Sequence, residues 1–90
     1  MITPNERRDL KSRAHHLRPV VMVGQKGITD ELIAATDRAL ADHELIKIKF
    51  IEFKEERREL ADEIVRRTAS DLVAIIGNVA ILYREGDDKE

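Results

Sequence analysis

The chain has 90 residues, of which 42% are hydrophobic and 38% charged, and its formal net charge is −2. This length suits one domain with a modest core, and the lack of cysteine excludes disulfides, thiolate nucleophiles and cysteine-based metal sites. No apolar run reaches the roughly 18–20 residues of a membrane span, and no secretory signal is visible, so we expect a cytoplasmic protein without membrane contact.

Charge is unevenly distributed along the chain. Residues 1–28 hold six basic and two acidic side chains, a local balance of +4, whereas residues 85–90 hold four acids and one lysine, a balance of −3. Local rather than total charge sets the potential that a phosphate meets within a Debye length of about 8–10 Å. The amino-terminal third is therefore the candidate surface for a polyanion.

A first helix is expected from about residue 4 to Arg18. Thr3 and Glu6 have the spacing of a capping box, and Pro4 suits the first helical position. The proline after Arg18 predicts the end of the helix. Its apolar stripe consists of Leu10, Ala14 and Leu17.

Alternating strands and helices are expected to follow. Residues 20–23 predict a short buried strand, and Thr29 caps a helix running to about Asp42 with an inward face that includes Leu32, Thr36 and Leu40. Residues 45–51 alternate with a period of two, so that Ile46, Ile48 and Phe50 point one way and Lys47 and Lys49 the other.

The last third predicts a helix and a hairpin. Residues 55 to about 70 form the helix, and strands 72–76 and 79–83 flank Gly77-Asn78, which suits a tight turn. The order is α-β-α-β-α-β-β, an α/β fold with a four-stranded mixed sheet and one partly open face. We expect one domain over residues 1–84 and an acidic, disordered tail over residues 85–90.

The glycine loop, Gly24-Gln25-Lys26-Gly27, is the most informative short motif. It lies between a predicted strand and a predicted helix start, where backbone amides and the helix N-terminus can face one anion. Glycines let a phosphodiester approach the backbone closely, and Lys26 adds a positive charge. Two glycines in a strand-to-helix turn are also common without any ligand.

Basic side chains extend the candidate site. On a helix, five residues fall within about 100° of one another: Arg7, Arg8, Lys11, His15 and Arg18. Because few residues separate this stripe from the glycine loop, we expect one continuous footprint, which Lys47 and Lys49 could extend. The alternative is that these cations only solvate the surface.

Stacking and catalysis are both poorly supported. The aromatic residues are Phe50, Phe53 and Tyr83, of which we expect Phe50 in the core, Phe53 over a sheet edge and Tyr83 in a structural role. Modules that stack bases need several exposed aromatics, so binding should be mostly to the backbone. Nucleotide-binding glycine motifs and nucleophile–base pairs are missing, so we expect no enzyme, cofactor, metal or small-molecule substrate.

Three segments carry a family resemblance: HHLRPVVMVGQKGIT (15–29), ALADHELIKIKF (39–50) and VAIIGNVAILYR (73–84). Together they resemble the CRM domain (chloroplast RNA splicing and ribosome maturation) in its stand-alone, YhbY-like form, over about residues 4–84. The resemblance implies an α/β two-layer sandwich similar to the C-terminal domain of translation initiation factor three, and a KH-like GxxG loop that contacts RNA backbone at residues 24–27.

The resemblance also implies a partner. Stand-alone members are associated with precursors of the large ribosomal subunit, so we expect a monomer that binds ribosomal RNA during subunit assembly. The alternative is an interaction module that docks on a ribosomal protein or assembly factor through the open sheet face and the acidic tail.

Overall fold

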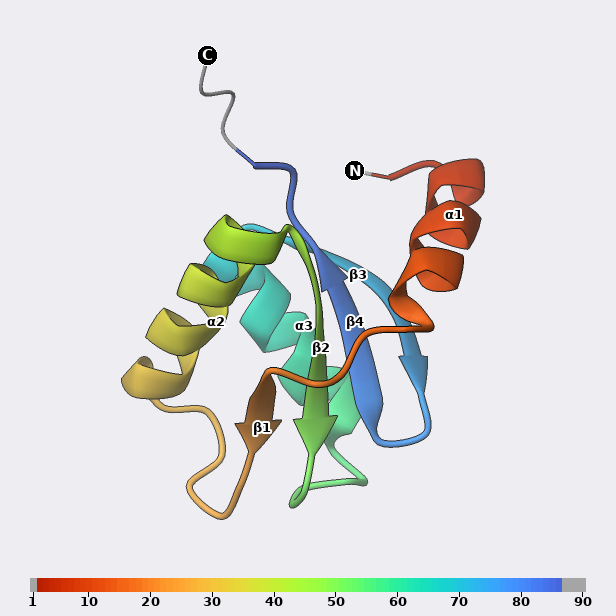
Figure 1. Ribbon diagram of the computed structural model, residues 1–90. Coiled ribbons are helices and arrows are strands. Elements are labelled where there is room, and N and C mark those ends of the chain that lie inside the picture. The colour runs from red at the N-terminus through yellow and green to blue at the C-terminus, as the bar shows by residue number, and fades with distance from the viewer. Residues whose placement is uncertain (1, 87–90) are drawn as a thin grey trace.

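The computed structural model describes residues 2–86 and contains three helices and four strands (Figure 1). In chain order they are α1 (Pro4–Ala14), β1 (Val21–Val23), α2 (Asp30–His43), β2 (Leu45–Phe50), α3 (Arg57–Thr68), β3 (Asp71–Ile76) and β4 (Val79–Tyr83). The α/β class and the predicted order of elements are confirmed. The third helix is shorter than expected by two residues at each end.

The four strands form one mixed sheet in the order β1-β2-β4-β3. β1 and β2 are parallel, and β4 is antiparallel to β2 and to β3. This arrangement follows from the connections, because α2 makes the crossover that a parallel pair needs and Gly77-Asn78 closes a tight hairpin. Gly77 has φ +60°, which a glycine adopts without a side-chain clash.

The two faces of the sheet are covered unequally. The main core lies between the sheet and α2 and α3, and its largest buried residues include Phe50, Leu40, Ile46, Ile48, Ile64 and Leu82. α1 packs on the opposite face, where Leu10 and Ala14 contact Leu45, Val73 and Ile81. Because one helix of 11 residues cannot cover four strands, part of this face remains open, as predicted (Figure 1).

The first helix begins as predicted but ends early. The Thr3 hydroxyl accepts the Glu6 amide at 3.1 Å and the Glu6 carboxylate accepts the Thr3 amide at 2.8 Å, which confirms the capping box. The helix stops at Ala14, and Leu17, expected in the apolar stripe, is 37% exposed. The stripe prediction was wrong at Leu17 because residues 15–20 leave the helix and cross the sheet.

β1 is exposed on one side. Val21 and Val23 lie in the core, but Val20 and Met22 are 53% and 55% exposed. The expectation of a buried strand over residues 20–23 was therefore wrong for half of its side chains. The reason is that α2 and α3 cover only the face that Val21 and Val23 occupy. Val20 and Met22 point to the opposite face, where α1 packs on β2, β3 and β4.

The predicted acidic tail lies largely outside the described residues. Of residues 85–90 the structure describes Glu85 and Gly86, and the Gly86 amide donates to the Glu44 carboxylate at 3.0 Å. Glu44 itself ends α2 with φ +66°. At this point the chain is held to the end of α2 rather than free.

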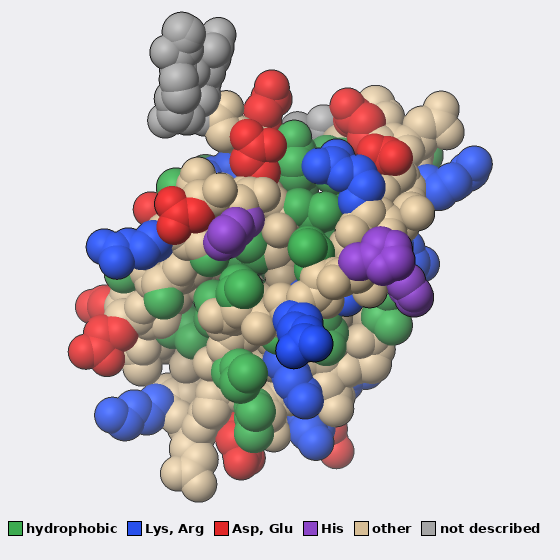
Figure 2. Space-filling view, viewed as in Figure 1, with side chains coloured by type: hydrophobic (Ala, Val, Ile, Leu, Met, Phe, Trp, Pro, Cys, Tyr) green, Lys and Arg blue, Asp and Glu red, His purple; other side chains and the backbone are tan. Residues whose placement is uncertain are grey.

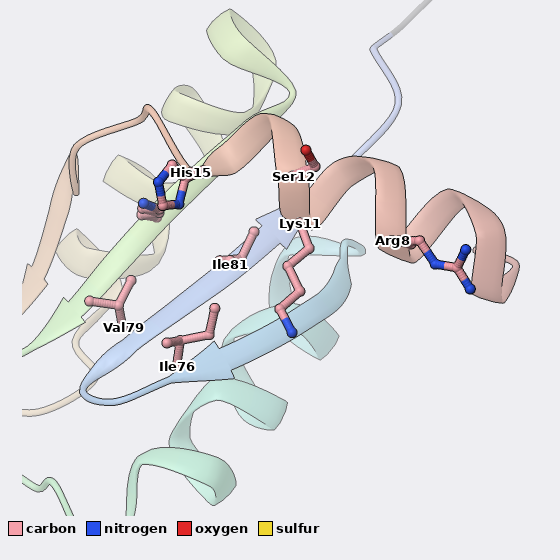
Figure 3. Close-up of a pocket in the computed structure, with 8 residues that line it drawn as sticks. Arg8, Lys11, Ser12, His15, Ile76, Val79 and Ile81 are labelled. Carbon is pink, nitrogen blue, oxygen red and sulfur yellow. The ribbon is translucent and has the colours of Figure 1, made fainter.

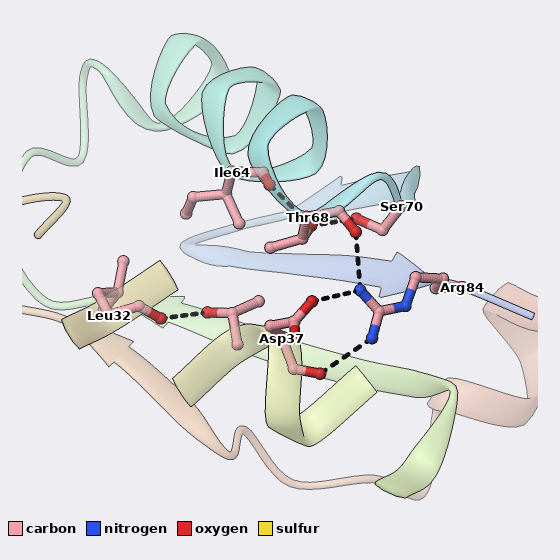
Figure 4. Close-up of polar contacts among 7 residues, drawn as sticks. Leu32, Asp37, Ile64, Thr68, Ser70 and Arg84 are labelled. Carbon is pink, nitrogen blue, oxygen red and sulfur yellow. Dashed lines mark hydrogen bonds and ion pairs between the residues drawn. The ribbon is translucent and has the colours of Figure 1, made fainter. Parts of the chain in front are cut away.

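Arg84 ties three elements together where β4 ends (Figure 4). Its Nη1 donates to Asp37 Oδ1 at 2.6 Å and to the Thr68 carbonyl at 2.8 Å, and its Nη2 donates to the Asp37 carbonyl at 3.0 Å. The side chain is only 24% exposed. A single guanidinium thus joins α2 to the last turn of α3, a geometry that the planar donor array of arginine suits.

We expect Arg84→Met to lower the free energy of unfolding by about 1–3 kcal/mol, because it leaves the Thr68 and Asp37 acceptors without their charged donor. Urea denaturation followed by circular dichroism measures this difference. Arg66→Met, which removes an exposed arginine from α3, is the matched control and should stay within about 0.5 kcal/mol of the natural chain. Equal effects of both substitutions would contradict a stabilising role for the Arg84 hydrogen bonds.

Tyr83 should titrate above the usual range of tyrosine. Burial raises the pKa of its phenol, and the nearby Glu44 carboxylate adds to the shift. The folded state therefore holds this proton more tightly than the unfolded chain, whose pKa is about 10, so stability should fall as the pH rises above about 10. Tyr83 is the only tyrosine and tryptophan is lacking, so tyrosinate absorbance reports this one group. Equal midpoints in native and urea-unfolded protein would refute the shift.

Candidate nucleic-acid interface

The open face is the exposed part of the sheet on the side of α1. One cross-strand row runs over all four strands and consists of Met22, Lys49, Val79 and Ile76. Lys47, two residues before Lys49, lies on the same face opposite Ile81. Lys47 and Lys49 therefore lie on β2 among apolar side chains of the neighbouring strands. Their place on one face agrees with the period of two in the sequence.

The glycine loop follows β1 at the end of the sheet where the β3–β4 hairpin also turns (Figure 1). The Gly27 amide donates to the Gly24 carbonyl at 3.0 Å, which closes a tight turn. Gln25 and Lys26 are exposed at its tip. Among residues 2–86, their backbone amides have no hydrogen-bond acceptor, so both remain available to a ligand.

The two glycines of the loop have different reasons to be glycine. Gly27 has φ +68°, a conformation that side chains rarely adopt. Gly24 is not in that region, and a Cβ added there would meet nothing within 4 Å. The fold itself therefore favours glycine at position 27 but does not require it at position 24. The space beside the Gly24 backbone is open to a ligand.

Phe53 supports the loop, a contact that the sequence did not reveal. A Cβ added to Gly27 would lie 3.5 Å from Phe53 Cε2, so the ring packs against the loop that follows the edge strand β1. The amides of Ile51 and Glu52 donate to the Val23 carbonyl at 2.9 and 3.2 Å. The segment after β2 thus holds the glycine loop in place.

The start of α2 is a weaker anion site than expected. The Thr29 hydroxyl already accepts the Leu32 amide at 3.0 Å. Asp30 and Glu31 place two carboxylates in the first turn, where they interact favourably with the helix dipole themselves. We therefore attribute anion binding at this end to the loop amides and Lys26 rather than to the helix N-terminus.

The cations of α1 separate into two groups. Arg7 donates its Nη1 to the carbonyls of Leu72 and Val73 at 2.7 and 2.6 Å, so it anchors the helix to β3. Arg8, Lys11 and His15 instead border a hollow between α1 and the sheet. In Figure 3 the Lys11 side chain extends from the helix across β3 and β4, while Arg8 points outward at the rim.

This hollow, called the α1 hollow below, is open to solvent and has a volume of about 580 Å³. Its lining consists of Arg8, Lys11, Ser12, His15, Lys47, Ile76, Val79 and Ile81. The β3–β4 hairpin supplies an apolar floor and α1 supplies a polar wall (Figure 3). The helical pattern predicted the cations of this site but not its floor, which only the register of the hairpin places beneath the helix.

The connecting segment 15–20 crosses β2 between these sites. Lys47 Nζ donates to the Leu17 carbonyl at 3.0 Å, and the Val20 amide donates to the Lys47 carbonyl at 3.0 Å. Lys47 therefore has a structural contact in addition to its place at the α1 hollow. Arg18 lies apart from that hollow, beside Arg13 and His43 in a second depression.

The basic helix and the glycine loop, expected to form one continuous footprint, are not in direct contact. α1 packs against Leu45, at the start of β2, whereas the loop lies beside Phe50 at its end. Five residues of strand separate these positions by about 17 Å, which exceeds the Debye length of about 8 Å at physiological salt. One phosphate cannot bind both, but a polymer could, because Lys47 and Lys49 lie between them.

Figure 2 shows lysine and arginine side chains in a line down the middle of this face, with apolar side chains beside them. From the glycine loop to α1 the basic track consists of Lys26, Lys49, Lys47 and Lys11. In residues 2–86 we find neither a helix long and apolar enough to cross a membrane nor a group of three potential metal-ligating His, Asp or Glu residues.

The chain is similar to several known proteins. It is 42% identical over 93% of its length to "Probable RNA-binding protein PA4753" of Pseudomonas aeruginosa, covering 82% of that protein. It is 36% identical over its full length to "Probable RNA-binding protein YqeI" of Bacillus subtilis, covering 95% of it. The "RNA-binding protein" of Haemophilus influenzae is 39% identical over 97% of this chain and 89% of its own length.

A solved structure and a family model agree with these relatives. The solution structure of Staphylococcus aureus SAV1595, described as a candidate RNA-binding protein, superposes with a TM-score of 0.86 at 33% identity, covering all of this chain and 95% of that one. The model of the CRS1/YhbY (CRM) domain matches residues 2–84. This match covers nearly the whole described chain, including the glycine loop and the hairpin. The protein belongs to the CRS1/YhbY (CRM) domain family.

Proposed function

We propose that this protein binds RNA by its phosphate backbone along the open face. The observation that carries the proposal is the basic track, which joins the glycine loop to α1 across the middle strand of the sheet. RNA binding is the activity in the names of the relatives described above. An extended polyanion fits this surface better than a small anion, because the cations are spread over more than one Debye length.

Each part of the track has a distinct task in this proposal. The free amides of Gln25 and Lys26 bind one phosphate at the glycine loop, and Lys26 neutralises its charge. Lys49, which is exposed, and Lys11 contact further phosphates along the strand. If each of the four lysines of the track neutralises one phosphate, log affinity should fall against log salt with a slope of about −3 to −3.5.

We further propose ribosomal RNA as the ligand, in precursors of the large ribosomal subunit. This step is supported by the family resemblance and by a polyanion-binding surface that has few means to read base sequence. Sedimentation of a cell lysate tests it directly. The protein should travel with large-subunit fractions and leave them after ribonuclease treatment, and a protein found only in the free fraction would contradict the ribosomal step.

A second candidate function is docking on a protein through the segment after β2. Ile51 and Phe53 are 46% and 40% exposed, and Glu52, Glu55 and Glu56 flank them. Carboxylates on this segment repel RNA, so an apolar and basic protein surface would fit it better. Crosslinks from Lys54 to protein but none from Lys26 to RNA would favour docking over RNA binding.

The double substitution Gln25→Asp/Lys26→Asp should weaken binding of all RNA sequences alike by about tenfold or more, because it changes the loop charge by −3 and repels phosphate. The magnitude of the salt slope should fall by about 0.7–0.9 with the lost lysine contact. Fluorescence anisotropy over a salt series measures both values. Ala35→Asp/Arg38→Asp makes the same −3 change on exposed positions of α2. Equal losses in both variants would show that only net charge matters.

Gly24→Ala tests whether RNA approaches the loop backbone. Because a Cβ there contacts nothing in the protein and the backbone is not left-handed, stability should change by less than about 0.5 kcal/mol. RNA affinity should nevertheless fall several-fold if a phosphodiester lies against this glycine. In contrast, Gly27→Ala strains a positive φ and should cost about 1 kcal/mol of stability. Unchanged RNA affinity of the stable Gly24→Ala variant would remove Gly24 from the contact surface.

A further inference from the structure

The floor of the α1 hollow is not explained by backbone binding. Ile76 is 51% exposed although it lies beside a buried core, and Val79 next to it is only partly covered. Phosphate contacts need cations and amides, not aliphatic side chains. An exposed aliphatic floor next to a basic track therefore points to a ligand that has an apolar face as well as a negative charge.

The wall of the hollow narrows the chemistry of that ligand. Lys11 and Lys47 supply positive charge, Arg8 adds another at the rim, His15 supplies a group that can hydrogen bond, and the lining contains no carboxylate. An acidic or anionic occupant is favoured over a basic one by this charge alone. The volume of about 580 Å³ lies in the range of small-ligand sites, roughly 300–1,000 Å³.

We propose that the α1 hollow receives one unpaired nucleotide of the bound RNA, an inference that rests on the function proposed above. The base lies flat on Ile76 and Val79, its polar edge faces His15, and its phosphate contacts Lys11. Aliphatic side chains take the place of the exposed aromatic rings that stack bases in other modules.

The position of the hollow fits this occupant. Lys47 belongs both to its lining and to the basic track, so a strand that follows the track passes the mouth of the hollow. The Lys11 side chain reaches over the hairpin toward the floor (Figure 3). A base in a duplex is paired and stacked and cannot enter, so this protein should prefer RNA with an unpaired nucleotide to a blunt duplex of the same length.

The test compares adenosine 5′-monophosphate with ribose 5-phosphate, which carries the same phosphate and sugar but no base. Methyl NMR of the whole chain should show shifts at Ile76, Val79 and Ile81 with the nucleotide that saturate at millimolar concentration. Ribose 5-phosphate should leave these methyl groups unmoved. Equal shifts with both compounds, or none with either, would overturn the proposal.

A variant separates this inference from the proposed function. Ile76→Ser should lower affinity for RNA with an unpaired nucleotide by about fivefold or more, the low end of a base-stacking contact, and leave blunt duplex binding unchanged. Ile51→Ser is the control, because it removes a comparably exposed side chain outside the hollow and keeps the Ile51 amide that supports the glycine loop; it should bind both RNAs like the natural chain. If Ile76→Ser binds both RNAs like the natural chain, the base site is wrong while RNA binding stands. If the natural chain shows no salt-dependent RNA binding, the proposed function itself is wrong.

Discussion

The molecule is organised by the unequal covering of a sheet that has two faces. Four strands place apolar side chains on both sides, and α2 and α3 are committed to one of them. Only the 11 residues of α1 remain for the other side, and they cover it over β3, β4 and the start of β2. The α1 hollow and the lysines of β2 lie at the area that α1 leaves uncovered.

Two side-chain contacts keep that area open and fixed. Arg7 joins α1 to the carbonyls of β3, and Lys47 holds the connecting segment at Leu17. Both cations looked like candidate ligands for phosphate, yet both donate to backbone carbonyls. A hydrogen bond to a charged donor contributes roughly 1.5–3 kcal/mol. The helix is therefore positioned by charged groups as well as by its small apolar patch of Leu10 and Ala14.

Local patterns in the sequence were sufficient for the elements and their order. The capping box at Thr3 and Glu6, the alternation of residues 45–50 and the turn at Gly77-Asn78 depend on neighbours in the chain, and each is confirmed. Leu17 and Val20 were misassigned because periodicity shows which residues share a side but not whether another element covers that side. The α1 hollow needed the same missing information, since its floor and wall are about 60 residues apart.

The net charge of −2 is compatible with a polyanion-binding surface because the opposite charges occupy different places. Lys47 and Lys49 of the basic track share the open face of the sheet, whereas Glu52, Glu55 and Glu56 lie on the segment after β2 and Asp30 and Glu31 on α2. Local rather than total charge sets the potential that a phosphate meets, so a net charge of −2 does not prevent this face from binding a polyanion.

Affinity and selectivity then have different physical origins on this face. Phosphate contacts act on any sequence and weaken with salt, so the basic track alone would bind every RNA. The α1 hollow excludes paired bases by geometry and gains most of its energy from apolar contact, which salt does not screen. Raising the salt concentration therefore weakens phosphate binding by the basic track more than base binding in the α1 hollow. Because the two free energies add, the ratio of affinities for a duplex with and without one unpaired nucleotide is set by the hollow alone, and it should stay the same while total affinity decreases with salt.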